Sequence, residues 1–282
     1  MGLDGNLQDA MSALMLNAAV IAFPDIDPVI IAFGPFAVRW YALAYIAGLL
    51  FAQWYMKRLV SNPALWGGST PTMTPQQIDE FFVWTVLGVV LGGRLGYVLF
   101  YNPLHYISHP IDIARLWDGG LSFHGGFLGV VVACLIYGRK IGSGLDAMLD
   151  LGAASVPVGL GLGRLANFIN GELYGRATDV PWAFIFPTDP AQIARHPSQL
   201  YEAVLEGLVL FLAVKRFGAL RYAGRASGIF ALGYGLSRIA VEFAREPDAH
   251  IGFFGGFITM GMILSLPLCA IGVWLLLRSR RA

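Results

Sequence analysis

Residues 163–175, GRLANFINGELYG, place four polar side chains directly after an apolar run. They are Arg164, Asn167, Asn170 and Glu172. An arginine guanidinium can bind phosphate through two parallel hydrogen bonds, and neighbouring carboxamides can complete a hydrogen-bonded cradle. The stretch therefore predicts recognition of a phosphate-bearing group. An architectural alternative is a polar plug that satisfies the unwound end of a membrane helix.

A second group of polar side chains repeats at helical spacing in YGLSRIAVEF. Tyr234, Arg238 and Glu242 are four residues apart, which places them on one helix face. Arg238 can pair with Glu242 on the next turn, either as a purely structural ion pair or within a phosphate site. An arginine near a helix end, such as Arg164, can also simply extend to the membrane interface. Two arginines at one depth favour the phosphate of a phospholipid head group.

Two histidines could act as general bases, because imidazole titrates near neutral pH. His124 lies between glycines in GGLSFHGGFLG, which leaves room for another molecule, and His196 precedes Pro197. The alternatives are a packing residue for His124 and a helix-entry residue for His196. The sequence has no GxSxG, SxxK or HExxH motif and no metal-ligand spacing, so we expect the substrate to supply the nucleophile.

The composition indicates an integral membrane protein. Hydrophobic residues make up 56% of the chain and charged residues only 13%, about half the share of a soluble domain. The net charge of +1 gives no reason to expect a nucleic-acid partner. Cys134 and Cys269 lie in apolar runs, which favours packing over a disulfide. The run at 10–23 lacks a preceding basic region, so we interpret it as an interfacial segment and not as a cleaved signal peptide.

Seven apolar segments approach the length of about 20 residues that a membrane-spanning helix needs. They cover residues 36–56, 80–101, 121–138, 145–166, 199–215, 227–244 and 257–277. Thr74, Pro75 and Gln77 predict a capped start for the second helix. We therefore expect an all-α membrane protein with seven transmembrane helices, forming a single integral membrane domain over residues 1–282.

The distribution of positive charge predicts the orientation of these segments. One set of alternate connections carries eleven Lys and Arg residues; the other carries four, namely Arg115, Arg176, Arg195 and Arg245. The positive-inside rule places the richer set in the cytoplasm. The N-terminus and the polar insertion at 167–198 are then outside, and the C-terminus is inside.

Charged groups near a bilayer usually face a cavity or a partner. By this topology, six ionisable side chains reach the outer level of the membrane: Arg94, His124, Arg164, Glu202, Arg238 and Glu242. Their convergence from several segments predicts a site facing outside. The four-residue spacing of Gly88, Gly92 and Gly96 instead predicts close packing of helix backbones.

Several motifs resemble the signature sequences of one bacterial enzyme family. Besides GRLANFINGELYG they are VRWYALAY, LGGRLGYVLFYN, DGGLSFHGG, RHPSQLYEAVLEG and SRIAVEFAREPD, in the family's order over most of the chain. On these motifs the sequence is identified as a member of the prolipoprotein diacylglyceryl transferase family. The resemblance implies a bacterial inner-membrane enzyme with seven helices and an active site open to the periplasm. The insertion is compact for the family, which implies a small periplasmic head at 167–198.

The resemblance also implies the reaction and its partners. Members transfer a diacylglyceryl group from phosphatidylglycerol to the thiol of the lipobox cysteine in a prolipoprotein signal peptide. They form a thioether and release glycerol phosphate. The implied partners are these two substrates and membrane lipids, with no cofactor, metal or nucleic acid.

The motif matches and the reasoning above together define the expected site. We expect catalysis to involve His124, Arg238, Glu242 and Tyr41. We expect phosphatidylglycerol to be bound by Arg164, Asn167, Asn170, Glu172, Gly175, Arg94, Tyr234 and His196.

Individual roles follow from the chemistry of the side chains. The two arginines would stabilise charge on the leaving phosphate, and Glu172 would either fix the local turn or balance Arg164. Glu242 would position Arg238, and Tyr41 would donate a hydrogen bond to a head-group oxygen. His124 is the favoured base for the thiol, with Glu242 and His196 as alternatives.

Two other classes of protein fit parts of the sequence. A lipid flippase or transporter would have an outward-facing polar cavity, although transporters commonly contain inverted repeats and no repeat is evident here. A non-catalytic lipid-binding scaffold would retain the phosphate site without the transfer reaction.

Overall fold

The computed structural model describes residues 21–34, 36–246, 254 and 258–279. Most of the predicted interfacial segment at 10–23 lies outside the described residues. The described chain is mostly helical and divides into two compact units. The first unit comprises Met1–Phe51, Val156–Phe217 and Gly228–Leu275, and the second comprises Ala52–Ser155, Gly218–Ser227 and Leu276–Ala282.

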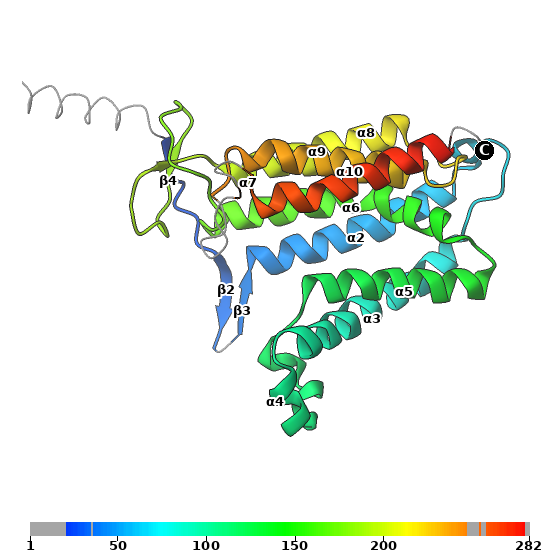
Figure 1. The fold of residues 1–282 in the computed structure, drawn as a ribbon, viewed down its shortest axis with the longest axis horizontal. Coiled ribbons are helices and arrows are strands. Elements are labelled where there is room, and N and C mark those ends of the chain that lie inside the picture. Colours follow the sequence, from blue (N-terminus) through cyan, green and yellow to red (C-terminus); the bar gives the residue numbers. More distant parts are fainter. Residues whose placement is uncertain (1–20, 35, 247–253, 255–257, 280–282) are drawn as a thin grey trace, which may run out of the picture. The chain divides into compact units, whose positions relative to one another are not determined.

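The first unit contains most of the helices that carry the predicted site residues (Figure 1). Helix α2 begins in this unit, α6 ends in it, and most of α9 and α10 belongs to it. The helical elements are α2 (Trp40–Val60), α6 (Leu145–Ile169), α7 (Ser198–Glu202), the π-helical turn η4 (Ala203–Val209), α8 (Leu210–Phe217), α9 (Arg225–Glu242) and α10 (Met260–Ser279).

Short strands accompany these helices. In a three-stranded sheet, β4 (Phe184–Ile185) pairs in parallel with β1 (Ile21–Ala22) and antiparallel with β5 (Ala194–Arg195). Strands β2 (Val29–Phe33) and β3 (Phe36–Arg39) form an antiparallel hairpin that leads directly into α2. The predicted insertion at 167–198 thus contains β4 and β5 between the end of α6 and the start of α7.

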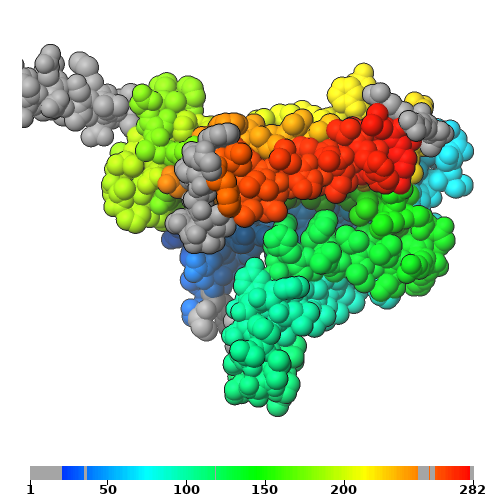
Figure 2. Space-filling model, viewed as in Figure 1, coloured from blue at the N-terminus to red at the C-terminus, as the bar shows by residue number. Residues whose placement is uncertain are grey.

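The second unit is built around a helix pair, α3 (Pro75–Phe100) and α5 (Phe123–Ile141). Its shorter elements are η1 (Pro63–Trp66), α4 (Pro103–Ser108), η2 (Pro110–Ala114) and η3 (Leu116–Asp118). Helix α3 begins with the predicted capping box, in which Thr74 and Gln77 exchange hydrogen bonds of 2.8 and 3.2 Å. Figure 2 shows the segment from α4 to η3 as a projection beyond α3 and α5.

Helices α3 and α5 pack with their backbones in direct contact (Figure 1). A Cβ atom on Gly129 would lie 1.9 Å from the carbonyl oxygen of Gly88, and one on Gly92 would lie 2.4 Å from that of Gly125. No side chain fits at either position. This arrangement confirms the close packing predicted from the spacing of the glycines in α3, and is the usual means of bringing helices together in lipid.

Replacing Gly129 by alanine should therefore lower the free energy of unfolding by about 1–3 kcal/mol, because the added methyl group forces the two helices apart. Thermal unfolding in detergent micelles measures the change. Gly152→Ala is the matched control, since a Cβ atom there meets nothing within 4 Å. It should leave stability equal or slightly higher, because alanine favours the helix. Equal melting temperatures for the two variants would contradict the prediction.

Four helices among the described residues are long and apolar enough to cross a membrane: α3, α5, α6 and α10. They coincide closely with four of the predicted spans. The other three predicted spans are mainly helical, and correspond to α2, to α9 and to α7, η4 and α8 in succession. The π-helical turn within the last of these was not predicted. The predicted start of the first span at residue 36 was wrong, because Phe36–Arg39 pair with β2 as strand β3 and the helix begins at Trp40. Cys134 and Cys269 are free thiols, as expected.

Candidate active site

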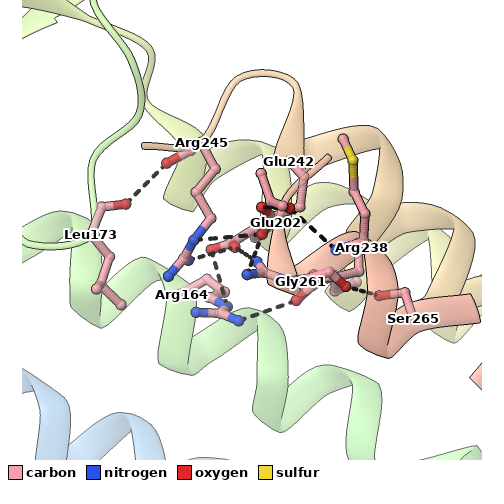
Figure 3. A network of polar contacts seen from close by, with 12 residues as sticks. Arg164, Leu173, Glu202, Arg238, Glu242, Arg245, Gly261 and Ser265 are labelled. Atoms are coloured by element: carbon pink, nitrogen blue, oxygen red, sulfur yellow. Dashed lines mark hydrogen bonds and ion pairs between the residues drawn. The ribbon is translucent and has the colours of Figure 1, made fainter. Parts of the chain in front are cut away.

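A network of charged side chains lies in the first unit, on α6, α7, η4, α9 and the turn that follows α9 (Figure 3). It joins three arginines to three glutamates: Arg164, Arg238 and Arg245 with Glu202, Glu206 and Glu242. The glutamate side chains are at most 3% exposed, whereas the arginine side chains are 15–21% exposed. The arginines are therefore the part of the network that an incoming anion can reach.

Glu202 is the centre of this network. Its Oε1 accepts hydrogen bonds from Arg238 at 2.6 Å and from Arg245 at 3.2 Å. Its Oε2 lies 3.2 Å from Nε of Arg164. Three guanidinium groups are thus held by one fully buried carboxylate. The sequence placed Glu202 near the outer membrane surface but assigned it no role.

A contact between glycines brings α6 against the π-helical turn η4. A Cβ atom on Gly207 would lie 2.7 Å from Cα of Gly161, so η4 cannot carry a side chain here, and one on Gly161 would lie 3.1 Å from Cα of Gly207. Arg164 follows Gly161 by three residues, and Glu206 directly precedes Gly207. The close approach therefore sets Arg164 within reach of Glu206, where Nη2 lies 3.5 Å from Oε2.

Glu242 is fixed from two directions. As predicted, it pairs with Arg238 one turn earlier, at 2.5 Å from Nη2. Thr259 donates a hydrogen bond of 2.6 Å to its other oxygen. The backbone of Gly261 packs against the carboxylate, since a Cβ atom there would lie 2.5 Å from Oε1. Glu242 therefore holds Arg238 in a defined position, in agreement with its expected role.

The stretch that follows α6 forms a hydrogen-bonded turn around Glu172. Oε1 of Glu172 accepts hydrogen bonds from the side-chain amides of Asn167 at 2.9 Å and Asn170 at 3.1 Å. The ion pairs of Arg164 go instead to Glu202 and Glu206. Of the two roles expected for Glu172, the structure therefore favours the one that fixes the geometry of the turn.

The first turn of α7 locks this turn from the other side. Gln199 donates to the carbonyl of Glu172 at 2.6 Å, and Ser198 donates to that of Leu173 at 2.9 Å. Leu173 has a φ of 58°, a left-handed conformation that is unfavourable for a side-chain-bearing residue. Hydrogen bonds from two buried side chains hold it there. Residues of the RHPSQLYEAVLEG motif thus hold the turn formed by the GRLANFINGELYG motif.

Gly175 and Arg176 attach the insertion to the end of α9. Gly175 forms an antiparallel bridge with Arg245, and a Cβ atom on Gly175 would lie 2.2 Å from the carbonyl oxygen of Ala244. The guanidinium of Arg176 donates to the carbonyls of Arg245 at 2.7 Å and Glu242 at 2.8 Å. These contacts satisfy carbonyls at the end of α9. Gly175 therefore acts by permitting close approach of the backbone.

His196 takes part in a chain of hydrogen bonds. Trp182 donates to the hydroxyl of Tyr201 at 2.7 Å, and that hydroxyl lies 3.1 Å from Nδ1 of His196. An indole N–H can only donate, so the Tyr201 proton is available for Nδ1. Burial lowers the pKa of His196, and Arg176 acts in the same direction. The lowered pKa favours the neutral imidazole, and its Nδ1 is engaged by the Tyr201 hydroxyl.

The two predicted tyrosines belong to the same unit. The hydroxyl of Tyr41 lies 3.4 Å from that of Tyr45, and their ring centroids are 5.0 Å apart. Tyr234 is half-buried on α9 and stacks on Phe230 with ring centroids 6.0 Å apart. Tyr234 precedes Arg238 by one turn, as its spacing predicted.

Arg94 and His124 belong to the second unit. Arg94 is buried, and its guanidinium donates to four backbone carbonyls of the segment between α3 and α5, at 2.5–3.2 Å. It therefore secures this segment, and the structure does not bring it into the arginine network. His124 is exposed in the first turn of α5, with its ring 5.6 Å from that of Phe123.

The insertion contains its own buried ion pair. Arg195 donates hydrogen bonds to Asp189 at 2.7 and 3.2 Å, and the Asp189 side chain is 1% exposed. The hydrogen bond from Arg195 is the main cause that lowers the pKa of Asp189 below its ordinary value. The ion pair therefore stabilises the folded insertion at pH values above about 3.9, the ordinary pKa of aspartate. This stabilisation is lost as the pH falls through the lowered pKa of Asp189.

Two results should follow for the insertion. Replacing Asp189 by asparagine should weaken protection of its backbone amides by about 1–2 kcal/mol at neutral pH, because Arg195 loses a charged acceptor. The same loss of amide protection should appear in the wild-type protein as the pH falls below about 4. The variant has no carboxylate at this position, so acidification over the same range should cause no such additional loss. Hydrogen exchange of peptides from residues 171–198 measures both. Unchanged exchange in the variant at neutral pH would refute the assignment.

The sequence interpretation missed two members of the network, Glu206 and Arg245, and the residue that supports Glu242, Thr259. Glu206 lies inside the apolar run LYEAVLEGLVL, where an ionisable residue is itself a functional signal. Arg245 was counted only as a loop charge, and Thr259 gave no signal because it is a common residue in a membrane segment. Glu202 and Glu206 are four residues apart, so their spacing alone could have indicated a paired carboxylate face.

Comparison with known proteins agrees with the motifs. A family model described as prolipoprotein diacylglyceryl transferase matches residues 28–278. Proteins named phosphatidylglycerol–prolipoprotein diacylglyceryl transferase from Brucella canis, Brucella suis and Brucella melitensis are each 55% identical over 277 residues. The similarity covers 96% of this chain and 98% of each of those proteins.

Proposed function

Because the chain belongs to the prolipoprotein diacylglyceryl transferase family, we propose that it transfers the diacylglyceryl group of phosphatidylglycerol to a cysteine thiol of a prolipoprotein. This reaction is the first step of lipoprotein maturation. The observation that carries the proposal is the set of three partly exposed arginines held by buried carboxylates in a membrane protein. Such a set suits the phosphate of an anionic lipid.

The chemistry is an alkyl transfer to sulfur. The thiolate of the lipobox cysteine attacks the carbon of the diacylglyceryl group that bears the phosphate ester. A C–S bond forms, the C–O bond breaks, and its electron pair leaves with glycerol phosphate. The thiol proton passes to a base, and the phosphorus atom keeps all four of its bonds to oxygen. Negative charge therefore grows on the leaving phosphate, where arginines can stabilise it.

Each residue contributes through its position. Arg164 and Arg238 bind the phosphate, and Glu242 and Glu202 orient them. Asn167, Asn170 and Glu172 hold the turn beside Arg164, and Gly175 and His196 belong to its support. Tyr41 and Tyr234 offer hydroxyl groups to the head group.

The surroundings of three side chains decide between the candidates for the proton acceptor. His124 stays our candidate, because its ring is exposed and belongs to a matched family motif. His196 is disfavoured by its hydrogen bond with Tyr201. Glu242 is disfavoured because both of its oxygens already have partners in Arg238 and Thr259.

The membrane arrangement is part of the same proposal. The chain forms one membrane domain over 1–282 with seven spans, made by α2, α3, α5, α6, the α7–η4–α8 segment, α9 and α10. It lies in the bacterial inner membrane with the N-terminus and the 167–198 insertion in the periplasm and the C-terminus in the cytoplasm. The four apolar helices and the distribution of positive charge support this orientation.

A transfer assay with purified protein tests the activity. Phosphatidylglycerol and a lipobox peptide with one cysteine are the substrates, and lipidated peptide and glycerol phosphate are measured together. Wild-type protein should release the two products in equal amounts. A peptide with serine in place of cysteine should give neither product, because the thiol is the nucleophile, and Arg238→Ala should give little of either.

The result can also contradict the proposal. If folded wild-type protein binds phosphatidylglycerol but forms no lipidated peptide, the protein is a lipid-binding scaffold or a lipid carrier. Movement of labelled lipid between the leaflets of a vesicle, without peptide, would identify the carrier.

A further inference from the structure

Buried acceptors without donors gather in one part of the chain. Among the residues that the structure describes, four buried side-chain oxygens have no hydrogen-bond partner: Asn170 Oδ1, Gln199 Oε1, Glu202 Oε2 and Glu206 Oε1. Of these, Glu202 Oε2 still has an ion-pair contact, with Nε of Arg164 at 3.2 Å. Native proteins satisfy nearly all buried polar atoms, so each exception calls for an explanation. All four atoms are acceptors, and all lie between the end of α6 and the π-helical turn. A ligand that brings hydrogen-bond donors would satisfy them.

Three of these acceptors form a stripe along one helix face. Gln199, Glu202 and Glu206 follow each other at intervals of three and four residues in α7 and η4. Their side chains are fully buried. The stripe meets the Glu172 turn at Gln199 and the arginine network at Glu202 and Glu206.

The pairing of the two carboxylates is unequal. Glu202 contacts three arginines, whereas Glu206 pairs, among the described residues, with Arg164 at 3.5 Å. At that distance the contact is a weak hydrogen bond. Oε1 of Glu206 accepts no hydrogen bond among the described residues. Glu206 thus has acceptor capacity beyond what Arg164 uses.

Binding of a phosphate would increase this capacity. An arginine that turns its N–H groups to phosphate withdraws them from the carboxylates that held it. A phosphodiester is itself an acceptor and cannot replace these donors. Hydroxyl groups can, and they are the donors that a polyol head group presents.

We propose that Gln199 and Glu206, at the two ends of this stripe, bind the two hydroxyl groups of the lipid head group, and that they select a glycerol-bearing phospholipid over others of equal charge. The inference rests on the proposed function, because it names how the same site recognises its lipid. A site built around buried acceptors rejects an analogue that lacks the matching hydroxyl, since the acceptors are then left without donors.

Two lipids of equal charge test the selectivity. Phosphatidylglycerol is compared with phosphatidyl-1-propanol, which has the same phosphodiester and carbon chain length in its head group but no hydroxyl. Wild-type protein should prefer phosphatidylglycerol in kcat/KM by at least about fivefold for each acceptor left unmatched. Binding of both lipids in micelles is measured in parallel by native mass spectrometry, so the preference is tested even without turnover.

Two substitutions of Glu206 separate its acceptor from its charge. Glu206→Leu removes both, and should reduce the preference between the lipids by about fivefold or more. Glu206→Gln removes the charge but keeps an acceptor oxygen, and should keep most of the preference. If the leucine variant does not fold, Gln199→Met gives the same test at the other end of the stripe.

The outcomes distinguish this inference from the proposed function. Equal use and equal binding of the two lipids by wild-type protein would overturn the inference, while transfer from phosphatidylglycerol would still support the activity. If the protein preferred phosphatidylglycerol in binding but showed no transfer, the inference would be supported and the proposed activity would be contradicted. A preference that is unchanged in Glu206→Leu and Gln199→Met would show that the stripe does not read the head group.

Discussion

Replacing Arg164 by lysine should lower kcat/KM for diacylglyceryl transfer by about 10²–10³-fold, most of it in kcat. Arg164 contacts Glu202 through Nε and Glu206 through Nη2, and its side chain is 21% exposed. A lysine ammonium is a single point donor and cannot hold two carboxylates while it also meets a phosphate. The loss should fall on the transition state, where charge on the leaving phosphate is largest. Initial rates over a range of lipid concentrations separate kcat from KM.

The control for Arg164→Lys is the same substitution at Arg115. Arg115 pairs with Asp112 at 3.1 Å, and its side chain is 50% exposed. An exposed ion pair contributes little, so kcat/KM should stay within about twofold of wild type. If Arg164→Lys changed KM alone and left kcat intact, the arginine would bind the lipid equally in ground and transition states, and its proposed catalytic contribution would be wrong.

Replacing Glu202 by glutamine should lower the free energy of unfolding by about 3–5 kcal/mol, since it leaves buried positive charge without its partner. Glu202 is the shared acceptor of Arg164, Arg238 and Arg245, and its side chain is fully buried. A neutral amide also adds an N–H₂ group that faces the guanidinium donors. Unfolding by heat or denaturant in micelles measures the loss, and activity is then compared per folded molecule.

Glu246→Gln is the matched control for Glu202→Gln. Glu246 also pairs with an arginine, Arg195 at 3.0 Å, but its side chain is 51% exposed. The change should lower stability by less than about 1 kcal/mol. If the two variants lost the same stability, Glu202 would act as an ordinary surface charge and the network would not hold the arginines.

Contacts within a single helix could be predicted from the sequence. Arg238 and Glu242 pair as their four-residue spacing indicated, and the capped start of α3 follows from Thr74, Pro75 and Gln77. In each case the geometry depends only on the helical repeat and on local hydrogen-bonding chemistry. The glycine spacing in α3 predicted a backbone contact for the same reason, although it did not identify α5 as the partner.

Contacts between helices could not be predicted in this way. The meeting of Arg164 with Glu202 and Glu206 depends on the contact between Gly161 and Gly207 and on the unpredicted π-helical turn. Periodicity treats the segment as a regular helix and gives no partner across the interface. The role of Gln199 was equally hidden, because its hydrogen bond goes to a backbone carbonyl 27 residues earlier.

The geometry of the site depends on the number of residues in the π-helical turn at Ala203–Val209. Its i→i+5 hydrogen bonds accommodate one residue more per turn than an α-helix would. Loss of one residue between Glu202 and Gly207 would remove the π-helical turn and shorten the spacing between Glu202, which holds the arginines, and Gly207, which meets the backbone of α6. A span that faces only lipid can tolerate a deletion by shifting its depth, whereas this span cannot. Deletion of one residue from this segment should therefore reduce activity more than most single substitutions in it.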